Sequence, residues 1–210
     1  MIAAFLLAAA AAPTAVDAER AFARDAQRLG QWTAFAKYAA PDAVMFEPQA
    51  VWAREFLKGR KNPPRTVRWW PVHSFVSCDG RTAVNTGPWV APDGKTHGSF
   101  ATVWQRSGRQ WRWVYDAGEA EDGPLPVARK AQTHRAACRG KAPGAPVIPP
   151  PALTPSQART TPEDNGRGES GDKTLGWDWK VEKNGTRHLR VFMWNGLRYA
   201  QVLVKTVPAQ

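Results

Sequence analysis

The hydrophobic period of this chain changes once, from helical spacing to strict alternation, and that change limits its fold class. Up to about residue 58, apolar side chains recur three or four positions apart, which is the spacing of one helix face. From residue 67 to residue 117 they alternate with polar side chains, which indicates strands. Helices followed by an antiparallel meander are typical of an α+β domain.

The helical part predicts two amphipathic helices. The first runs from Asp17, its expected N-cap, to Leu29, and Gly30 ends it. The second runs from Trp32 to Ala39 and ends before a Pro-Asp pair. A short strand at 43–46 and a third short helix at 53–58 complete this part.

Four strands are predicted after residue 66, at 67–78, 82–90, 96–106 and 111–117, with Gly-containing turns between them. A four-residue turn between the last two strands would place Trp104 opposite Trp113 and Thr102 opposite Tyr115. Phe100 would share that face. Asp116 would then point to the opposite side, away from this aromatic face.

The composition changes after Gly118. We expect a short helical extension at 119–139 and a Pro/Gly-rich linker at 140–173. A three-stranded meander should follow at 174–207, because two Asn-Gly pairs separate alternating segments. Two-residue turns would pair Trp177 with Phe192 and Trp194 with Leu197. Such a sheet is marginal alone, so we expect it to dock on the main domain; the alternative is an exposed aromatic platform for a glycan.

The first 15 residues resemble a signal peptide, because a short apolar tract is followed by small residues. This predicts cleavage between Ala9 and Ala18 and a periplasmic or secreted protein; the alternative is an alanine-rich helix on a cytosolic protein. No later segment is apolar enough for a membrane span. In an oxidising compartment Cys78 and Cys138 could form a disulfide, although two free thiols fit the sequence equally well.

The net charge is +11, from 29 lysines and arginines against 18 acidic residues. These cations are scattered rather than gathered in a run, so no nucleic-acid partner is predicted. Two cysteines and four single histidines lack the spacing of a metal site, and we expect no metal. The absence of a Gly-rich phosphate loop argues against a nucleotide cofactor, and no cofactor is expected.

Four segments resemble the nuclear transport factor 2-like superfamily, and in particular its SnoaL-like, steroid-isomerase-like branch of small bacterial proteins. They are AERAFARDAQRLGQWTAFAKYAAPDAVMFEP (18–48), TGPWV (86–90), HGSFATVWQR (97–106) and WRWVYDAG (111–118), and they lie within residues 18–118, about half of the chain. The resemblance implies a cone-shaped, curved antiparallel sheet, covered by the N-terminal helices, over residues 16–118. Its concave face would enclose an apolar pocket lined by Phe100, Thr102, Trp104, Trp113 and Tyr115.

The resemblance also suggests where chemistry could occur. Steroid isomerases of this superfamily use a carboxylate base, a tyrosine and a protonated aspartate. Glu47 matches the position of the base, and it is the candidate catalytic residue. Phe22 stands at the tyrosine position and Thr102 at that of the aspartate. Phe22 cannot donate a hydrogen bond, and losing one oxyanion donor costs about 3 kcal/mol or more, so a working isomerase of that type is not expected. Tyr115 is the candidate substitute. His73 and His97 are lone strand histidines, which are more often structural.

These observations favour an exported small-molecule-binding or accessory protein with an aromatic pocket and a small hydrophobic ligand. One alternative is an isomerase or lyase that uses Glu47 as its general base. A second is a non-catalytic, dimerising scaffold, in which the chain forms a homodimer and the pocket is filled. The fold alone does not decide among them, because the same fold carries unrelated functions.

Overall fold

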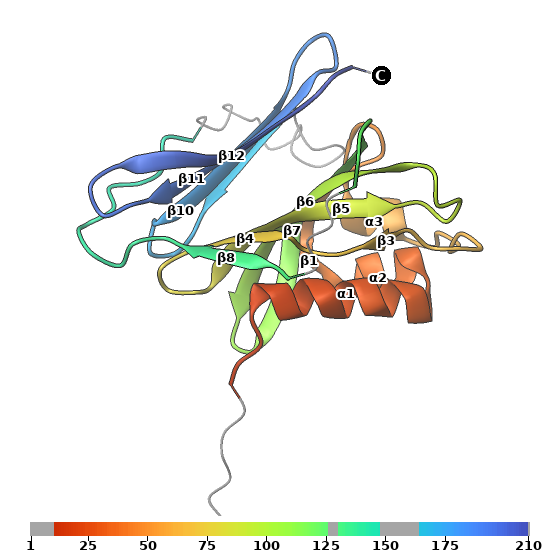
Figure 1. The fold of residues 1–210 in the computed structure, drawn as a ribbon, viewed down its shortest axis with the longest axis horizontal. Helices are drawn as coiled ribbons and strands as arrows, with labels where there is room; N and C mark the ends of the chain where they lie inside the picture. The colour runs from red at the N-terminus through yellow and green to blue at the C-terminus, as the bar shows by residue number, and fades with distance from the viewer. Residues whose placement is uncertain (1–10, 126–129, 148–163, 210) are drawn as a thin grey trace, which may run out of the picture.

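The computed structural model describes residues 11–125, 130–147 and 164–209, and these residues form three layers (Figure 1). Helices lie on one face of a large sheet, and a smaller C-terminal sheet lies across the other face. We call these two faces of the large sheet the helix face and the outer face. The fold class is therefore α+β, as predicted.

The helical layer has three helices, α1 (Ala15–Leu29), α2 (Gln31–Tyr38) and α3 (Ala53–Leu57). Gly30 separates the first two with a φ of 96°, a conformation that glycine adopts without strain. The predicted N-cap was wrong. Thr14 caps α1, and Asp17 is the third helical residue, whose side chain accepts a hydrogen bond from the Thr14 backbone in a capping box.

The large sheet has eight strands in the order β2-β1-β7-β6-β5-β4-β8, and β3 also pairs with β5. Its central meander is antiparallel, whereas β1 and β8 pair in parallel with β7 and β4. The predicted strand 67–78 is divided in two around Pro71, which cannot donate to a ladder. The strands are β1 (Ala39–Phe46), β2 (Ala50–Trp52), β3 (Arg68–Trp69), β4 (His73–Val76), β5 (Thr82–Val90), β6 (His97–Ser107), β7 (Gln110–Ala120) and β8 (Gln132–Arg135).

A β-bulge in β7 changes which side chains face the helices. Trp104 pairs with Trp113 as predicted, but Val103 pairs with Tyr115, so Val114 is an extra residue on β7. One extra residue moves all following side chains to the opposite face. Tyr115 therefore packs on the outer face, and Asp116, which the alternation had placed there, lies on the helix face opposite Thr102.

The C-terminal sheet has four strands in the order β12-β11-β10-β9. They are β9 (Asn165–Glu169), β10 (Leu175–Val181), β11 (Arg187–Trp194) and β12 (Tyr199–Val207). The strand β9 lies within the segment predicted as linker, of which residues 148–163 lie outside the described part. The predicted pairing was also wrong, because the connections are longer than two residues: Trp177 pairs with Val191, and Trp194 with Tyr199.

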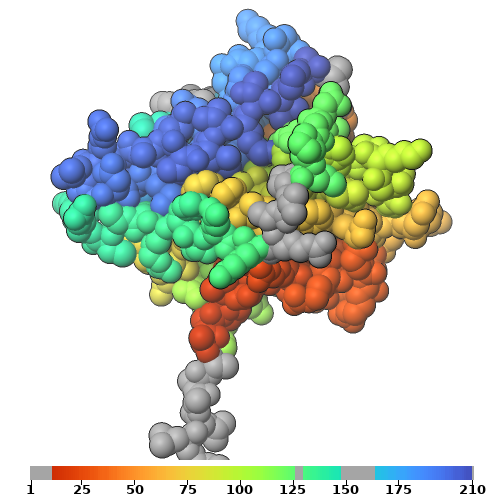
Figure 2. Space-filling model, in the orientation of Figure 1, coloured from red at the N-terminus to blue at the C-terminus, as the bar shows by residue number. Residues whose placement is uncertain are grey.

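The C-terminal sheet docks on the large sheet, as expected, and in Figure 2 it covers the side away from the helices. The two sheets share an apolar core. The Trp179 ring packs edge-on against the Phe46 ring, with centroids 5.3 Å apart. The centroid of the Tyr115 ring lies 6.4 Å from that of Trp179. Lys205 of β12 adds an ion pair with Glu119 of β7. Trp177 and Trp179 are thus buried against the large sheet, whereas the observed register places Phe192 and Trp194 on the other face of the C-terminal sheet, where they are also buried. The meander therefore does not present one open aromatic platform for a glycan.

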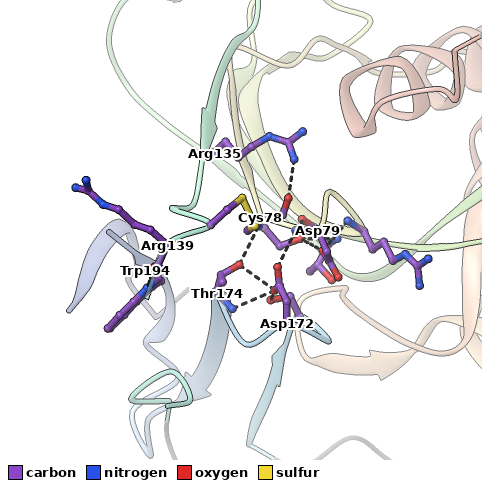
Figure 3. Close-up of a disulfide and its surroundings, with 12 residues drawn as sticks. Cys78, Asp79, Arg135, Arg139, Asp172, Thr174 and Trp194 are labelled. Carbon is purple, nitrogen blue, oxygen red and sulfur yellow. Dashed lines mark hydrogen bonds between the residues drawn. A yellow bond between two sulfur atoms is a disulfide. The ribbon is translucent and has the colours of Figure 1, made fainter. Parts of the chain in front are cut away.

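A disulfide joins Cys78, in the turn between β4 and β5, to Cys138, beyond β8 (Figure 3). The helical extension predicted for 119–139 is not found in its described part, where residues 132–135 form β8 beside β4. The edge of β4 offers backbone partners that a short isolated helix lacks. Close to the disulfide, the backbone N–H of Cys78 donates to the Thr174 hydroxyl at 2.8 Å, which connects this turn to the C-terminal sheet.

Candidate functional site

A cavity of about 160 Å³ lies between the helices and the large sheet. Its wall is mostly aromatic, because α1 and α2 contribute phenylalanines and the strands contribute tryptophans. Two carboxyl groups also line it. The lining residues are Phe22, Gln31, Phe35, Met45, Phe46, Glu47, Val67, Trp69, Trp89, Phe100, Asp116 and Gly118.

Asp116 is the polar group on the sheet wall of this cavity. Its Oδ2 accepts a hydrogen bond from the Thr102 hydroxyl at 2.7 Å, across the β6–β7 ladder. Burial raises the pKa of the Asp116 carboxyl to about 8, the bond from Thr102 lowers it, and the Glu19, Glu47 and Glu119 carboxylates raise it. The side chain is therefore a neutral acid at pH 7 and can donate one hydrogen bond into an apolar cavity.

Glu47 follows the last residue of β1 and lies at the mouth of the cavity, where it remains largely exposed. Partial burial raises the pKa of its carboxyl, and the Arg60 guanidinium opposes that shift. Because Glu47 in turn raises the pKa of Asp116, the two carboxyls interact across the cavity. The site thus combines one carboxyl near solvent with one on the inner wall.

A third carboxyl, that of Glu19, is fully buried below the cavity. It accepts hydrogen bonds from the indole N–H groups of Trp69 at 2.9 Å and Trp104 at 2.6 Å, and from the Asn85 amide at 3.2 Å. Burial raises the pKa of Glu19 to about 7, and these donors oppose the shift. Trp69 also lines the cavity, so Glu19 holds one of its aromatic walls in place.

The structure brings only part of the predicted site together. Glu47 and Phe100 line the cavity, and Thr102 lies behind Asp116 as its hydrogen-bond partner. Trp104 and Trp113 are fully buried and belong to the core. Tyr115 is excluded, because the bulge turns it to the outer face, among the side chains that meet the C-terminal sheet.

Sequence reasoning missed Asp116, Trp69 and Trp89. Asp116 was dismissed by the assumed alternation, and no turn residue marks the bulge at Val114. Trp89 lies in the quoted TGPWV segment, and its indole N–H donates to the backbone carbonyls of Ser99 and Glu119. Its place in that segment is the signal that could have indicated it.

Within residues 11–125, 130–147 and 164–209, no group of three or more His, Cys, Asp or Glu side chains is placed to hold an ion. The ring nitrogens of His97 are hydrogen-bonded to two backbone carbonyls, and a ring nitrogen of His73 lies 3.4 Å from one of His134. None of these three histidines lines the cavity. No helix in the described part has the length and apolarity that a bilayer crossing requires.

No family model matches this chain, and no curated protein is similar to it in sequence. Solved structures with a similar arrangement include a candidate ketosteroid isomerase from Parabacteroides distasonis, at 16% identity, a TM-score of 0.41, and coverage of 50% of this chain and 87% of that one. A nuclear transport factor 2-like protein of unknown function from Shewanella oneidensis is 14% identical, with a TM-score of 0.40 and coverages of 48% and 93%. A protein of unknown function from Pectobacterium atrosepticum is also 14% identical, with a TM-score of 0.39 and coverages of 52% and 94%.

Proposed function

We propose that this chain is an exported protein that binds a small, one-ring apolar molecule carrying a hydrogen-bond acceptor such as a carbonyl. The observation that carries this proposal is the Asp116 carboxyl, which accepts a hydrogen bond from Thr102 on the wall of an aromatic cavity, where burial raises its pKa and favours the neutral acid. The aromatic wall supplies apolar contact. The acid orients the ligand. One Asp116 oxygen accepts the hydrogen bond from the Thr102 hydroxyl, and the other can carry the proton that is donated to the ligand's acceptor.

The cavity volume limits the ligand. An apolar protein cavity of about 150 Å³ takes up benzene, and this one measures about 160 Å³. A single ring with a short substituent therefore fits, whereas a fused four-ring body does not fit within the cavity. Burial of about 150 Å² of ligand surface contributes roughly 4 kcal/mol, which association costs largely offset. The affinity must therefore depend on the polar contact.

Acetophenone and ethylbenzene are suitable probes, because they share a ring and differ in the carbonyl acceptor. Above about pH 9 the Asp116 carboxyl is ionised and no longer donates, so acetophenone should bind about threefold to tenfold more weakly than at pH 6. Ethylbenzene should show a smaller change. Quenching of tryptophan emission by each probe, titrated at both pH values, measures this difference.

Asp116→Asn is the matched control, because the amide keeps the shape and a donor but does not titrate. In this variant the acetophenone affinity should no longer depend on pH. Equal pH dependence for the two probes, or the absence of saturable binding by either, would contradict the proposal. Tyr115→Phe should leave the binding of both probes unchanged, because Tyr115 lies on the outer face.

A second candidate function is acid–base catalysis, and the two carboxyls in one apolar cavity favour it. In this reaction the Glu47 carboxylate removes a proton from the carbon beside a carbonyl. Asp116 donates its proton to the carbonyl oxygen, which gives an enol. Where the substrate carries a carbon–carbon double bond next to that carbon, the enol is a conjugated dienol. Glu47 then returns its proton to the far carbon of the dienol, the double bond shifts, and the enol hydroxyl returns its proton to the Asp116 carboxylate, which completes an isomerisation. Asp116 would take the donor role that Phe22 cannot fill.

Exchange of the acetophenone methyl protons in D₂O, followed by NMR, tests this second candidate. The protein should accelerate the exchange, and Glu47→Gln should abolish the acceleration while acetophenone still binds. Binding without any acceleration would leave the first candidate intact and remove the second.

Export is the remaining part of the proposal. The disulfide between Cys78 and Cys138 supports it, because such bonds persist in oxidising compartments. The capping box at Thr14 supports it further, since the folded domain begins a few residues beyond the apolar tract. A leader could thus be removed without loss of any residue of α1.

A further inference from the structure

A second cavity, of about 230 Å³, lies at the opposite end of α1 from the aromatic site. Five parts of the fold meet there: the N-terminus of α1, strand β4 and its following turn, the hairpin between β6 and β7, and strand β8. Its lining is cationic overall, because two arginines, Arg106 and Arg135, face one carboxylate, that of Asp79.

Two hydrogen bonds and the disulfide hold this cavity in shape. The indole N–H of Trp111 donates to the Pro13 carbonyl at 2.8 Å and fixes the chain before α1. The Arg135 guanidinium donates to the Cys78 carbonyl at 2.8 Å, beside the disulfide that anchors the end of β8. The carboxylate of Asp79 accepts from the Ser77 hydroxyl and the Arg81 backbone within its own turn, which reduces its effect on the cavity.

Apart from the Asp79 carboxylate, the polar side chains that line this cavity carry hydrogen-bond donors. The N–H groups of Ala15 and Val16 have no acceptor within the helix, and the helix dipole favours an anion at this end. The hydroxyl of Ser74 is an independent observation. Its side chain is 1% exposed and lines the cavity, and its Oγ has no hydrogen-bond partner in the described part of the chain. A buried hydroxyl without a partner is costly, so it indicates a missing ligand or water.

We propose that this cavity binds a small organic carboxylate. The anionic group would lie among Arg106, the Ser74 hydroxyl and the first N–H groups of α1, and the apolar part would lie against Trp111 and Val76. A carboxylate matches the planar arginine fork. One negative charge matches the excess of one arginine over the Asp79 carboxylate. Half of the wall is apolar, which favours an organic body over a bare inorganic anion.

Sodium benzoate is the probe, with benzamide as its neutral analogue and sodium phosphate as the inorganic anion. A titration of the full-length protein followed by ¹H–¹⁵N NMR should give saturable shifts for the amides of Ala15, Val16 and Ser74. Benzamide should bind at least about tenfold more weakly, since it lacks the charge-assisted hydrogen bonds. Phosphate should also bind more weakly than benzoate, because it leaves the apolar wall uncovered.

Four variants locate the site. Arg106→Gln should weaken benzoate binding about tenfold or more, and Ser74→Ala about threefold. Arg81→Gln is the matched control: it removes an equal charge from an exposed neighbour that does not line the cavity, and it should change the affinity by less than about twofold. Asp116→Asn should leave these shifts unchanged, which separates this cavity from the aromatic one.

The proposal is overturned if benzoate gives no saturable shifts at these amides, in which case the Ser74 hydroxyl holds water only. Equal losses for Arg106→Gln and Arg81→Gln would also overturn it, because that result indicates general charge attraction. Thermal melting of each variant shows whether it is folded. Ser74→Ala removes an unpaired buried hydroxyl and should remain folded, so it keeps the test valid if Arg106→Gln does not fold.

Discussion

At the scale of single residues, two carboxyls on the helix face, those of Glu19 and Asp116, make the stability of this molecule depend on pH. Glu19 and Asp116 have folded-state pKa values of about 7 and about 8, against ordinary values near 4. Between about pH 4 and about pH 8, the two carboxyls bind more protons in the folded protein than in the unfolded chain. Its free energy of unfolding must therefore fall as the pH rises.

The first prediction concerns this pH dependence. The contribution of Asp116 and Glu19 is fully present below about pH 4 and is lost as the pH rises through about 7 to 8. The melting temperature should thus decrease between pH 5 and pH 9, by roughly 5 °C or more. In Asp116→Asn the decrease should be smaller, as measured by calorimetry at matched ionic strength. An identical slope in the two proteins would show that Asp116 titrates normally.

The second prediction concerns Trp104, which the sequence placed on the pocket wall. It is fully buried, and its indole N–H is one of the donors to Glu19. Trp104→Ala should therefore cost about 3–5 kcal/mol, because it leaves a cavity and removes a donor from a buried carboxyl. Phe100→Leu should be milder and should change the affinity for acetophenone. Urea unfolding followed by circular dichroism measures the stability of both variants. Unchanged stability in Trp104→Ala would contradict this placement.

At the scale of secondary-structure elements, the sequence predicted most of the elements but not their register. The helices and the four central strands follow from periodicity and turn residues, which are local signals. The bulge at Val114 and the five-residue connection between β10 and β11 depend on packing against other strands. A one-residue error in register exchanges the two faces of a strand. Asp116 and Tyr115 were exchanged for this reason.

The β8 and β9 strands show a different limit. Both lie at sheet edges and are short, and neither has an alternating apolar pattern: the residues of β8 are exposed and polar, and β9 consists of glycines and polar residues. Their strand conformation comes from backbone pairing with β4 and β10, which have unpaired edges without them. Such strands depend on neighbours distant in sequence, and so their own residues do not indicate them.

The third prediction concerns the start of α1. Because Thr14 caps this helix and Pro13 accepts a hydrogen bond from Trp111, cleavage of a leader should occur before Pro13. Intact mass of protein isolated from the native host measures the cleavage site. Thr14→Ala should cost about 1 kcal/mol, or roughly 2–4 °C in melting temperature. Cleavage beyond Thr14 would remove the cap and contradict the prediction, as would a mature protein that retains Met1.

At the scale of the whole molecule, one sheet separates two apolar cores. The helix-side core contains the aromatic cavity, and the outer core is shared between the large sheet and the C-terminal sheet. The large sheet thus has an apolar outer face, and the C-terminal sheet covers it. The aromatic pattern of the C-terminal meander made docking the better prediction, because the apolar surface of its aromatic side chains is too large to leave in water.

The last prediction tests this dependence. Truncation after Gly140 would expose Phe46, Val84 and Tyr115, so the melting temperature should fall by roughly 10 °C or more, or cooperative unfolding should disappear.

Because a truncated chain can aggregate, a point variant gives a cleaner measurement. Trp179→Ala removes one buried ring between the sheets and should cost about 3–5 kcal/mol. Val204→Ala, on the same sheet but half exposed, should cost less than about 0.5 kcal/mol. Equal costs for the two variants would mean that the two sheets do not share a core. The outer face of the large sheet would then have to be buried by something other than the C-terminal sheet.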